Sequence, residues 1–234
     1  MKKILLIVTM LFLVIGITGC EKVKPEEEKK PTADAVLFKE EYESFNGKKN
    51  DYFEYRNVEI EEFNPIVFAT DEEIVKMIEE EKSFIVYFGD PECPWCRSVV
   101  EQMIKSAKEN NVEKLYYVRF WDGFHNEKIR NVMELNAKNK PVEKTKGTDS
   151  YYKLLEYLDG VLSDYTLTTK AGKTVKTGQK RIFLPNVVAV VNGEAKELIE
   201  GISEKQDSYN GELTEEVIKD EKTMFNEFFS KYNK

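Results

Sequence analysis

The feature that most constrains the fold of this chain is a pair of cysteines two residues apart, in Cys93-Pro94-Trp95-Cys96. The apolar run 84–88 comes just before it, and a run with helical spacing begins at Pro94. Two thiols at a strand-to-helix turn are placed as a dithiol/disulfide couple requires. The first thiol meets the positive dipole end of the helix, which favours the nucleophilic thiolate, and the second lies one turn deeper, within reach of a disulfide. The motif therefore predicts a redox-active pair.

Two other interpretations of this pair carry less weight. A C-x-x-C pair also occurs as half of a zinc site, but structural zinc requires four ligands, usually sulfur and imidazole. The chain holds one further cysteine, Cys20, and one histidine, His125. If Cys20 carries a lipid, zinc would need His125 plus a carboxylate, so we expect no metal. A permanent structural disulfide is also a weak interpretation, because so short a ring contributes little loop-closure entropy.

The N-terminal segment has the pattern of a secretory signal. Met1-Lys2-Lys3 is basic, residues 4–17 are almost wholly apolar but short for a membrane span, and Thr18-Gly19-Cys20 follows. Small residues before a cysteine, directly after an apolar core, resemble the lipobox of bacterial lipoproteins. The resemblance implies removal of residues 1–19 and acylation of Cys20. The alternative, an ordinary signal peptide or an uncleaved anchor, would leave Cys20 as an odd, exposed thiol in an oxidising space.

The segment after Cys20 indicates a flexible tether, which we place at residues 20–35. Residues 21–31 are charged, interrupted by proline and without an apolar face. The remaining residues 36–234 suffice for one domain with its own core. The chain has a formal net charge of −8, which becomes −10 when Lys2 and Lys3 leave with the signal. An acidic chain argues against nucleic acid as a partner and against electrostatic docking on anionic lipid.

Strands and helices alternate along the predicted domain. Extended segments are expected at 52–60, 65–69, 84–88 and 114–121. Hairpins are expected at 165–177 and 187–199, where the turns Ala171-Gly172 and Asn192-Gly193 separate their strands. Helical spacing is expected at 38–45, 70–80, 94–109, 126–138, 150–162 and 214–232, the second of these opening on the capping box Thr70-Asp71-Glu72-Glu73.

At this point the chain resembles the thioredoxin superfamily. The residues that carry the resemblance are 84–88, Cys93-Pro94-Trp95-Cys96, Leu184-Pro185 before 187–191, and the last helix. Within the superfamily, the stretch 88–97 (Phe-Gly-Asp-Pro-Glu-Cys-Pro-Trp-Cys-Arg) looks most like membrane-anchored thioredoxin-like lipoproteins and the group called bacteriocin transport accessory proteins. The implied fold is α/β, a central mixed sheet flanked by helices, with a helical and hairpin insertion at about 122–181 before the strand that follows Pro185.

The resemblance also assigns roles to single residues. It implies a cis-proline at Pro185 that faces the dithiol, with the backbone of Leu184 pairing with an extended substrate chain; an ordinary trans proline at a strand start is the alternative. Pro94 and Trp95 would support the active site. Two departures stand out: Tyr87 takes the place of the buried Asp of thioredoxins, and Glu92 that of their Trp.

Charges and aromatic residues near the motif yield no second site. Glu92 beside Cys93 would oppose the thiolate, whereas Arg97 would favour it. His125, in a polar loop, is more simply an exposed residue than a base or ligand. Trp121, Phe120 and Phe124 suit a strand end and core better than a peptide-binding lip. The insertion itself suits a partner surface or lid as well as a solvated decoration without a role.

The sequence thus predicts a bacterial, lipid-anchored, extracytoplasmic thiol–disulfide oxidoreductase on the outer face of the cytoplasmic membrane. Cys93 would form a mixed disulfide with a protein partner, and Cys96 would resolve it. We expect a monomer with no bound cofactor that meets protein thiols or disulfides and a redox partner protein. Two alternatives stay open: a non-enzymatic accessory protein that holds a secreted peptide or a transporter subunit, and, more weakly, a metal-binding surface lipoprotein. The sequence leaves the redox direction open.

Overall fold

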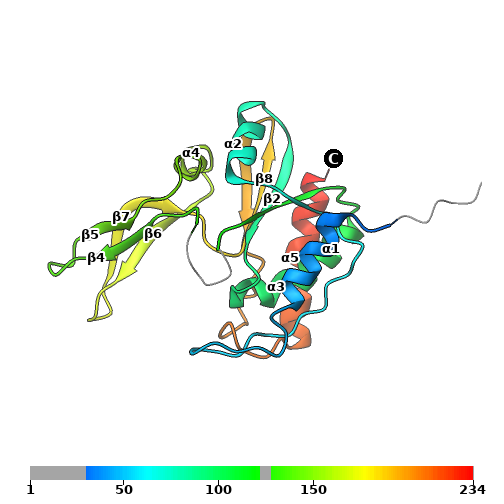
Figure 1. Ribbon diagram of the computed structural model, residues 1–234, viewed down its shortest axis with the longest axis horizontal. Coiled ribbons are helices and arrows are strands. Elements are labelled where there is room, and N and C mark those ends of the chain that lie inside the picture. Colours follow the sequence, from blue (N-terminus) through cyan, green and yellow to red (C-terminus); the bar gives the residue numbers. More distant parts are fainter. Residues whose placement is uncertain (1–29, 122–127, 234) are drawn as a thin grey trace, which may run out of the picture. The chain divides into compact units, whose positions relative to one another are not determined.

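A five-stranded mixed sheet organises the part of the chain that the computed structural model describes, residues 30–121 and 128–233 (Figure 1). The strand order is β1-β3-β2-β8-β9. Strand β3 pairs in parallel with both β1 and β2, whereas β8 is antiparallel to both β2 and β9. The strands are β1 (Ile66–Phe68), β2 (Phe84–Gly89), β3 (Leu115–Arg119), β8 (Asn186–Val191) and β9 (Glu194–Ile199). The central strand β2 is buried along its whole length, as a strand covered on both faces must be.

Helices cover both faces of this sheet, and each face has its own apolar cluster. Because side chains alternate along a strand, Ile85 and Tyr87 enter one cluster and Val86 and Phe88 the other. The first cluster lies under α1 (Ala33–Glu43), α3 (Pro94–Glu109) and α5 (Glu215–Tyr232), and the second lies under α2 (Asp71–Glu79) and α4 (Asp149–Tyr157). This layering buries most of α3, while Pro94 and Trp95 of its first turn stay half-buried beside the cysteines.

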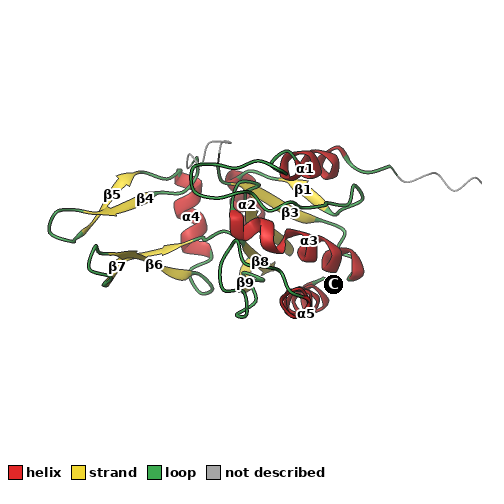
Figure 2. Ribbon diagram, turned by 90° about the horizontal axis from the view of Figure 1, so that it is seen from below, coloured by secondary structure: helices red, strands yellow, loops and turns green. Residues whose placement is uncertain are grey.

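Two hairpins between β3 and β8 form a separate region outside the central sheet (Figure 2). They are β4 (Val132–Leu135) with β5 (Pro141–Thr145), and β6 (Ser163–Thr168) with β7 (Thr174–Arg181). Buried polar groups join them at their base: the Asn131 side chain donates to Gln179 at 2.7 Å, and Arg181 donates to the Asn131 carbonyl at 2.8 Å. The Tyr165 hydroxyl accepts from the Met133 N–H at 3.2 Å. These bonds hold the two hairpins side by side.

Most predicted elements are present, but two predictions differ from the structure. The helix expected at 126–138 is wrong, because β4 occupies its second half; the backbone of Met133 bonds to β5 and to the Tyr165 hydroxyl instead. The segment 52–60, expected to be extended, joins no named strand; an isolated bridge pairs Glu54 with Lys49. Helix α1 begins at Ala33 behind the N-cap Thr32, within the expected tether.

The chain divides into two units, residues 1–30 and 31–234, and all the described helices and strands belong to the second. None of the helices in the described residues has the length and apolar character needed to cross a bilayer. Cys20, the predicted lipid attachment point, and the expected signal 1–19 lie outside the described residues.

Candidate functional site

Cys93 is the N-cap of α3, with Pro94 in the first helical position. Its sulfur accepts a hydrogen bond from the Cys96 N–H at 3.3 Å, which is the usual bond between a cap and its third helical residue. A free N–H at a helix start carries part of the positive end of the helix dipole, so a negative sulfur is stabilised there. Proline at this position removes an N–H that would otherwise be unpaired. The local sequence therefore aims the first thiol at the helix terminus, as the motif predicts.

Cys96 lies one turn deeper and has no exposed surface. Both cysteines are reduced, and Cys93 itself is 4% exposed, beside the half-exposed Pro94 and Trp95. Burial raises the pKa of the Cys96 thiol well above its ordinary value, and its hydrogen bond with Cys93 raises it further. Hydrogen bonds from the Tyr87 hydroxyl and the Asp90 N–H lower the pKa of Cys96 and offset part of this rise. Cys96 is thus held as a neutral thiol, and Cys93 retains the small exposed area of the pair.

The peptide bond between Leu184 and Pro185 is cis, as the resemblance implies. It directly precedes β8, which pairs with β2 so that Asn186 lies opposite Phe88, near the turn that leads to the cysteines. The Leu184 carbonyl consequently faces Cys93 and accepts its S–H at 3.6 Å. The Asn186 side chain fixes this corner by accepting from the Phe183 N–H at 3.0 Å and donating to the Pro185 carbonyl at 2.8 Å.

Tyr87 is the residue that the sequence matches to the buried Asp of thioredoxins. Its side chain is completely buried, and its hydroxyl donates to the Cys96 sulfur. The Tyr42 hydroxyl lies 2.7 Å from that of Tyr87. Either hydroxyl can be the donor in this bond. Gly89 makes the arrangement possible, since a Cβ at this position would lie 2.2 Å from the Tyr87 ring.

Asp90 shapes the loop between β2 and the cysteines. Its buried carboxylate accepts from the Glu92 N–H at 2.9 Å and from the Trp121 N–H at 3.0 Å, and it pairs with Arg119 at 3.4 Å. Its carbonyl accepts from the Cys93 N–H at 3.1 Å. Burial raises the pKa of Asp90, while the Glu92 N–H and Arg119 oppose that rise. The sequence had not singled out Asp90; its signal was a polar residue directly after an apolar strand.

Arg97 binds the N-terminal segment and not the reactive sulfur. The guanidinium is 1% exposed and donates to the carbonyls of Arg56 and Tyr42, both at 2.7 Å, and to Asn46 Oδ1 at 2.7 Å. A fourth bond reaches the Pro91 carbonyl at 3.0 Å in the active-site loop. The expectation that Arg97 serves the thiolate therefore misses its main role, which is to fix residues 42–56 against the start of α3.

An aromatic row flanks the dithiol. The Trp95 ring meets Tyr209 edge-on at a centroid distance of 6.0 Å, and Tyr209 in turn meets Phe53 at 5.4 Å. Phe53 comes from the N-terminal segment and Tyr209 from the loop after β9, so two segments distant in sequence complete the surroundings of Trp95. Glu92, 3% exposed, lies 3.5 Å from the Tyr55 hydroxyl behind this row. Neither Phe53 nor Tyr209 had a recognisable signal in the sequence.

The remaining candidates lie away from the cysteines or outside the described residues. His125 and Phe124 fall in the undescribed segment 122–127. Phe120 is fully buried in the core and Trp121 is half-buried beside it. Within residues 30–121 and 128–233, no cluster of three or more His, Cys, Asp or Glu side chains is placed to hold a metal ion.

No protein-family model and no curated protein matches this chain. A thiol at a helix cap, a second buried thiol one turn away and a carbonyl facing the first sulfur can together carry out thiol–disulfide exchange.

Proposed function

We propose that this chain is a thiol–disulfide oxidoreductase with a thioredoxin-like domain. The observation that carries the proposal is the placement of the Cys93 sulfur, which caps α3 and lies 3.6 Å from the carbonyl that precedes cis-Pro185. The strand order β1-β3-β2-β8-β9, with three parallel strands and an antiparallel final hairpin, supports the domain assignment. On this interpretation α4 and the two hairpins are an addition between β3 and β8.

In the reducing direction, the Cys93 thiolate attacks one sulfur of a partner disulfide. A bond forms between Cys93 and that sulfur, and the other partner sulfur leaves as a thiolate that takes up a proton. Cys96 then loses its proton and attacks the Cys93 sulfur, which releases the second partner thiol and leaves a Cys93–Cys96 disulfide. Two electrons have passed from the pair to the partner. The oxidising direction is the reverse, and an external dithiol or disulfide protein restores the starting state.

The buried groups around Cys96 suit its part in this cycle. Because burial raises the pKa of the Cys96 thiol, Cys96 stays protonated and does not compete with Cys93 as a nucleophile. The Tyr87 hydroxyl, which donates to the Cys96 sulfur, stabilises the negative charge that develops when Cys96 attacks. The Tyr42 hydroxyl forms a hydrogen bond of 2.7 Å with the Tyr87 hydroxyl and holds it in place. The Leu184 carbonyl and the adjacent backbone can form hydrogen bonds with the backbone of an extended partner chain.

We place the protein outside the cytoplasm, attached through a lipid on Cys20. The support is the sequence pattern of residues 1–20: a basic start, a short apolar core and small residues before the cysteine. In such a compartment protein disulfides are present as partners, and a membrane-bound redox protein is needed to recycle the pair.

The test is disulfide trapping with the purified full chain. We expect Cys96→Ser to accumulate a mixed disulfide with oxidised glutathione at Cys93, whereas Cys93→Ser gives none and the unaltered chain closes its own disulfide instead. Peptide mass spectrometry locates the adduct, and a Cys20→Ser background removes the third thiol from consideration. Failure of Cys93 to exchange with any small disulfide or dithiol would overturn the proposal and favour an accessory protein with idle cysteines.

A further inference from the structure

The two hairpins between β3 and β8 are basic, in a chain that is acidic overall. Residues 132–145 and 163–181 together hold eight Lys or Arg against three Asp or Glu, a formal net charge of +5, whereas the whole chain carries −8. The rest of the chain therefore carries −13. Charge segregated in this way on a local surface creates a local field that the net charge conceals. The expectation that an acidic chain avoids anionic surfaces applies to the body of the domain and not to these hairpins.

The turns of the two hairpins are built alike. In the first, the Asn136 side chain accepts from the Lys140 N–H at 3.0 Å; in the second, the Thr169 hydroxyl accepts from the Lys173 N–H at 3.0 Å. Each turn has a residue with positive φ just before that lysine, Asn139 at 54° and Gly172 at 79°. Such side-chain-capped turns have a defined shape. Each turn thus carries two exposed lysines on an ordered frame: Lys138 and Lys140 in one, Lys170 and Lys173 in the other.

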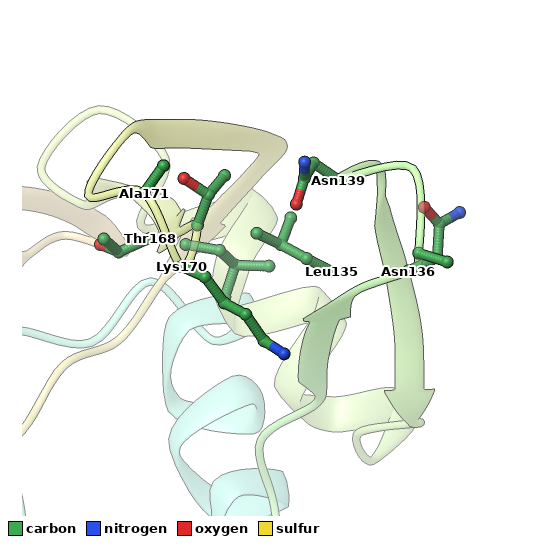
Figure 3. Close-up of a pocket in the computed structure, with 9 residues that line it drawn as sticks. Leu135, Asn136, Asn139, Thr168, Lys170 and Ala171 are labelled. Carbon is green, nitrogen blue, oxygen red and sulfur yellow. The ribbon is translucent and has the colours of Figure 1, made fainter.

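These four lysines differ from those along the strands. Lys144 pairs with Glu134, and Lys176 and Lys180 both pair with Asp164. No carboxylate of the described residues pairs with any of the four turn lysines, which are all exposed. A cleft of about 560 Å³ lies between the two turns (Figure 3). Leu135, Asn136 and Asn139 line it from one hairpin and residues 167–171 from the other, so the lining contains amide, hydroxyl and aliphatic groups.

We propose that this surface, defined as the two turns 136–140 and 169–173 with the cleft between them, docks on an anionic phospholipid bilayer. Unpaired lysines on ordered turns suit phosphate charge, and the polar groups of the cleft suit a headgroup. The proposal goes beyond thiol exchange and does not depend on it.

The sequence before the domain is compatible with this occupant. If a lipid is attached at Cys20, ten residues lead from it to Lys30, the first described residue. Such a segment reaches at most about 35 Å when fully extended, which keeps the domain beside the bilayer. Docking through the hairpins would then fix the orientation of an otherwise freely tumbling domain, while the acidic body is repelled from the same surface.

The test is lysine footprinting of the full chain with a membrane-impermeant acetylating reagent, read by peptide mass spectrometry. In vesicles of phosphatidylcholine with about one third phosphatidylglycerol, we expect the turn lysines to react at least about threefold more slowly than without vesicles. The exposed lysines Lys49, Lys114 and Lys219 of the five-stranded region serve as controls and should react unchanged. Phosphatidylcholine alone should give no protection, and about 0.5 M salt should abolish it.

A double variant shows whether both turns act as one surface. In Lys138→Gln/Lys140→Gln we expect the protection of Lys170 and Lys173 to fall by more than half, whereas Lys49→Gln/Lys114→Gln should leave it unchanged. Equal reaction of turn and control lysines with anionic vesicles would overturn the proposal. Protection by inorganic phosphate alone, to the same degree as by vesicles, would also overturn it, because the cleft would then be a site for a free anion. Thiol exchange is not measured, so this outcome is independent of the dithiol.

Discussion

Tyr87 places a neutral hydroxyl, and not a carboxylate, beside the buried Cys96 thiol. A buried carboxylate beside Cys96 would accept its proton directly, but it would also have to be desolvated. A hydroxyl remains neutral, and in the proposed exchange its hydrogen bond to the sulfur would stabilise the Cys96 thiolate without adding a charge of its own. We infer that Tyr87 positions and stabilises the second thiol and is not a base, since burial raises its own pKa well above 10.

Replacing Tyr87 with Phe removes this bond and keeps the ring. We expect the pKa of Cys96 to rise further, because one of the two groups that lower it is lost. Resolution of the mixed disulfide should slow by about three- to tenfold, the effect of one neutral hydrogen bond. Rapid quench of a single turnover, followed by gel separation of the mixed disulfide, measures this rate.

Tyr117 offers a matched control. Its ring stacks on Tyr87 with centroids 5.4 Å apart, and its buried hydroxyl has no hydrogen-bond partner in the described residues. Tyr117→Phe therefore removes the same atom from the same cluster without touching Cys96, and resolution should proceed at the unaltered rate. Equal slowing in both variants would mean that the cluster acts only through packing.

At the scale of elements, α3 connects the site to the N-terminal segment. Its first turn holds both cysteines, and Arg97 on the same turn donates to three carbonyls and one amide oxygen from three separate segments. Side-chain bonds take the place of a strand ladder along residues 46–60: Asn46 bonds both the N–H and the carbonyl of Val58, and Glu43 accepts from the Ile60 N–H. The segment is ordered by these few contacts.

We therefore expect Arg97→Met to cost about 2–4 kcal/mol of unfolding free energy, since it leaves buried carbonyls without a donor. Hydrogen exchange should increase first in residues 42–60 and only later in the central sheet. Arg97→Lys keeps the charge but reaches fewer acceptors, so its unfolding free energy should lie between those of the unaltered chain and Arg97→Met. Lys105→Met, on the more exposed side of the same helix, should change the unfolding free energy by no more than about 0.5 kcal/mol. Uniform loss of protection across the domain would contradict this role.

Local signals predicted the elements around the cysteines well. The capping box at Thr70, the proline after Cys93 and the Asn192-Gly193 turn each fix a boundary by short-range chemistry, and the structure has α2, α3 and the β8–β9 turn at those places. The helix predicted at 126–138 was wrong because the apolar spacing of this stretch also fits a strand. The deciding contact, between the Met133 N–H and the Tyr165 hydroxyl, joins residues 32 positions apart. Tyr42, 45 residues from Tyr87, was unpredictable for the same reason.

At the scale of the whole molecule, a single buried carboxyl ties stability to pH. Glu221, on α5, has no exposed surface, and neither of its oxygens has a hydrogen-bond partner in the described residues. Burial raises the pKa of Glu221 to about 8, although the nearby Arg56 lowers it somewhat. A carboxyl in this setting is held protonated at neutral pH, because ionising it would leave an unpaired charge in the core.

The folded chain therefore keeps a proton that the unfolded chain releases near the ordinary value of 4.5. Between about pH 4.5 and 8 the folded state binds more protons, so the stability due to this group is complete at the acidic end and falls as pH rises. Glu221→Gln removes the titration and keeps the shape. We expect both chains to be similarly stable near pH 5, and the variant to be more stable near pH 9 by on the order of 3–5 kcal/mol.

Urea unfolding of both chains, with thiols reduced, measures this difference at each pH from 5 to 9. All other groups titrate alike in the two chains, so the difference curve isolates Glu221. Glu227→Gln, on the exposed side of the same helix, should give a flat difference curve over this range. A flat curve for Glu221→Gln as well would show that the carboxyl ionises in the folded chain as readily as in the unfolded one, and would contradict the raised pKa of this buried group.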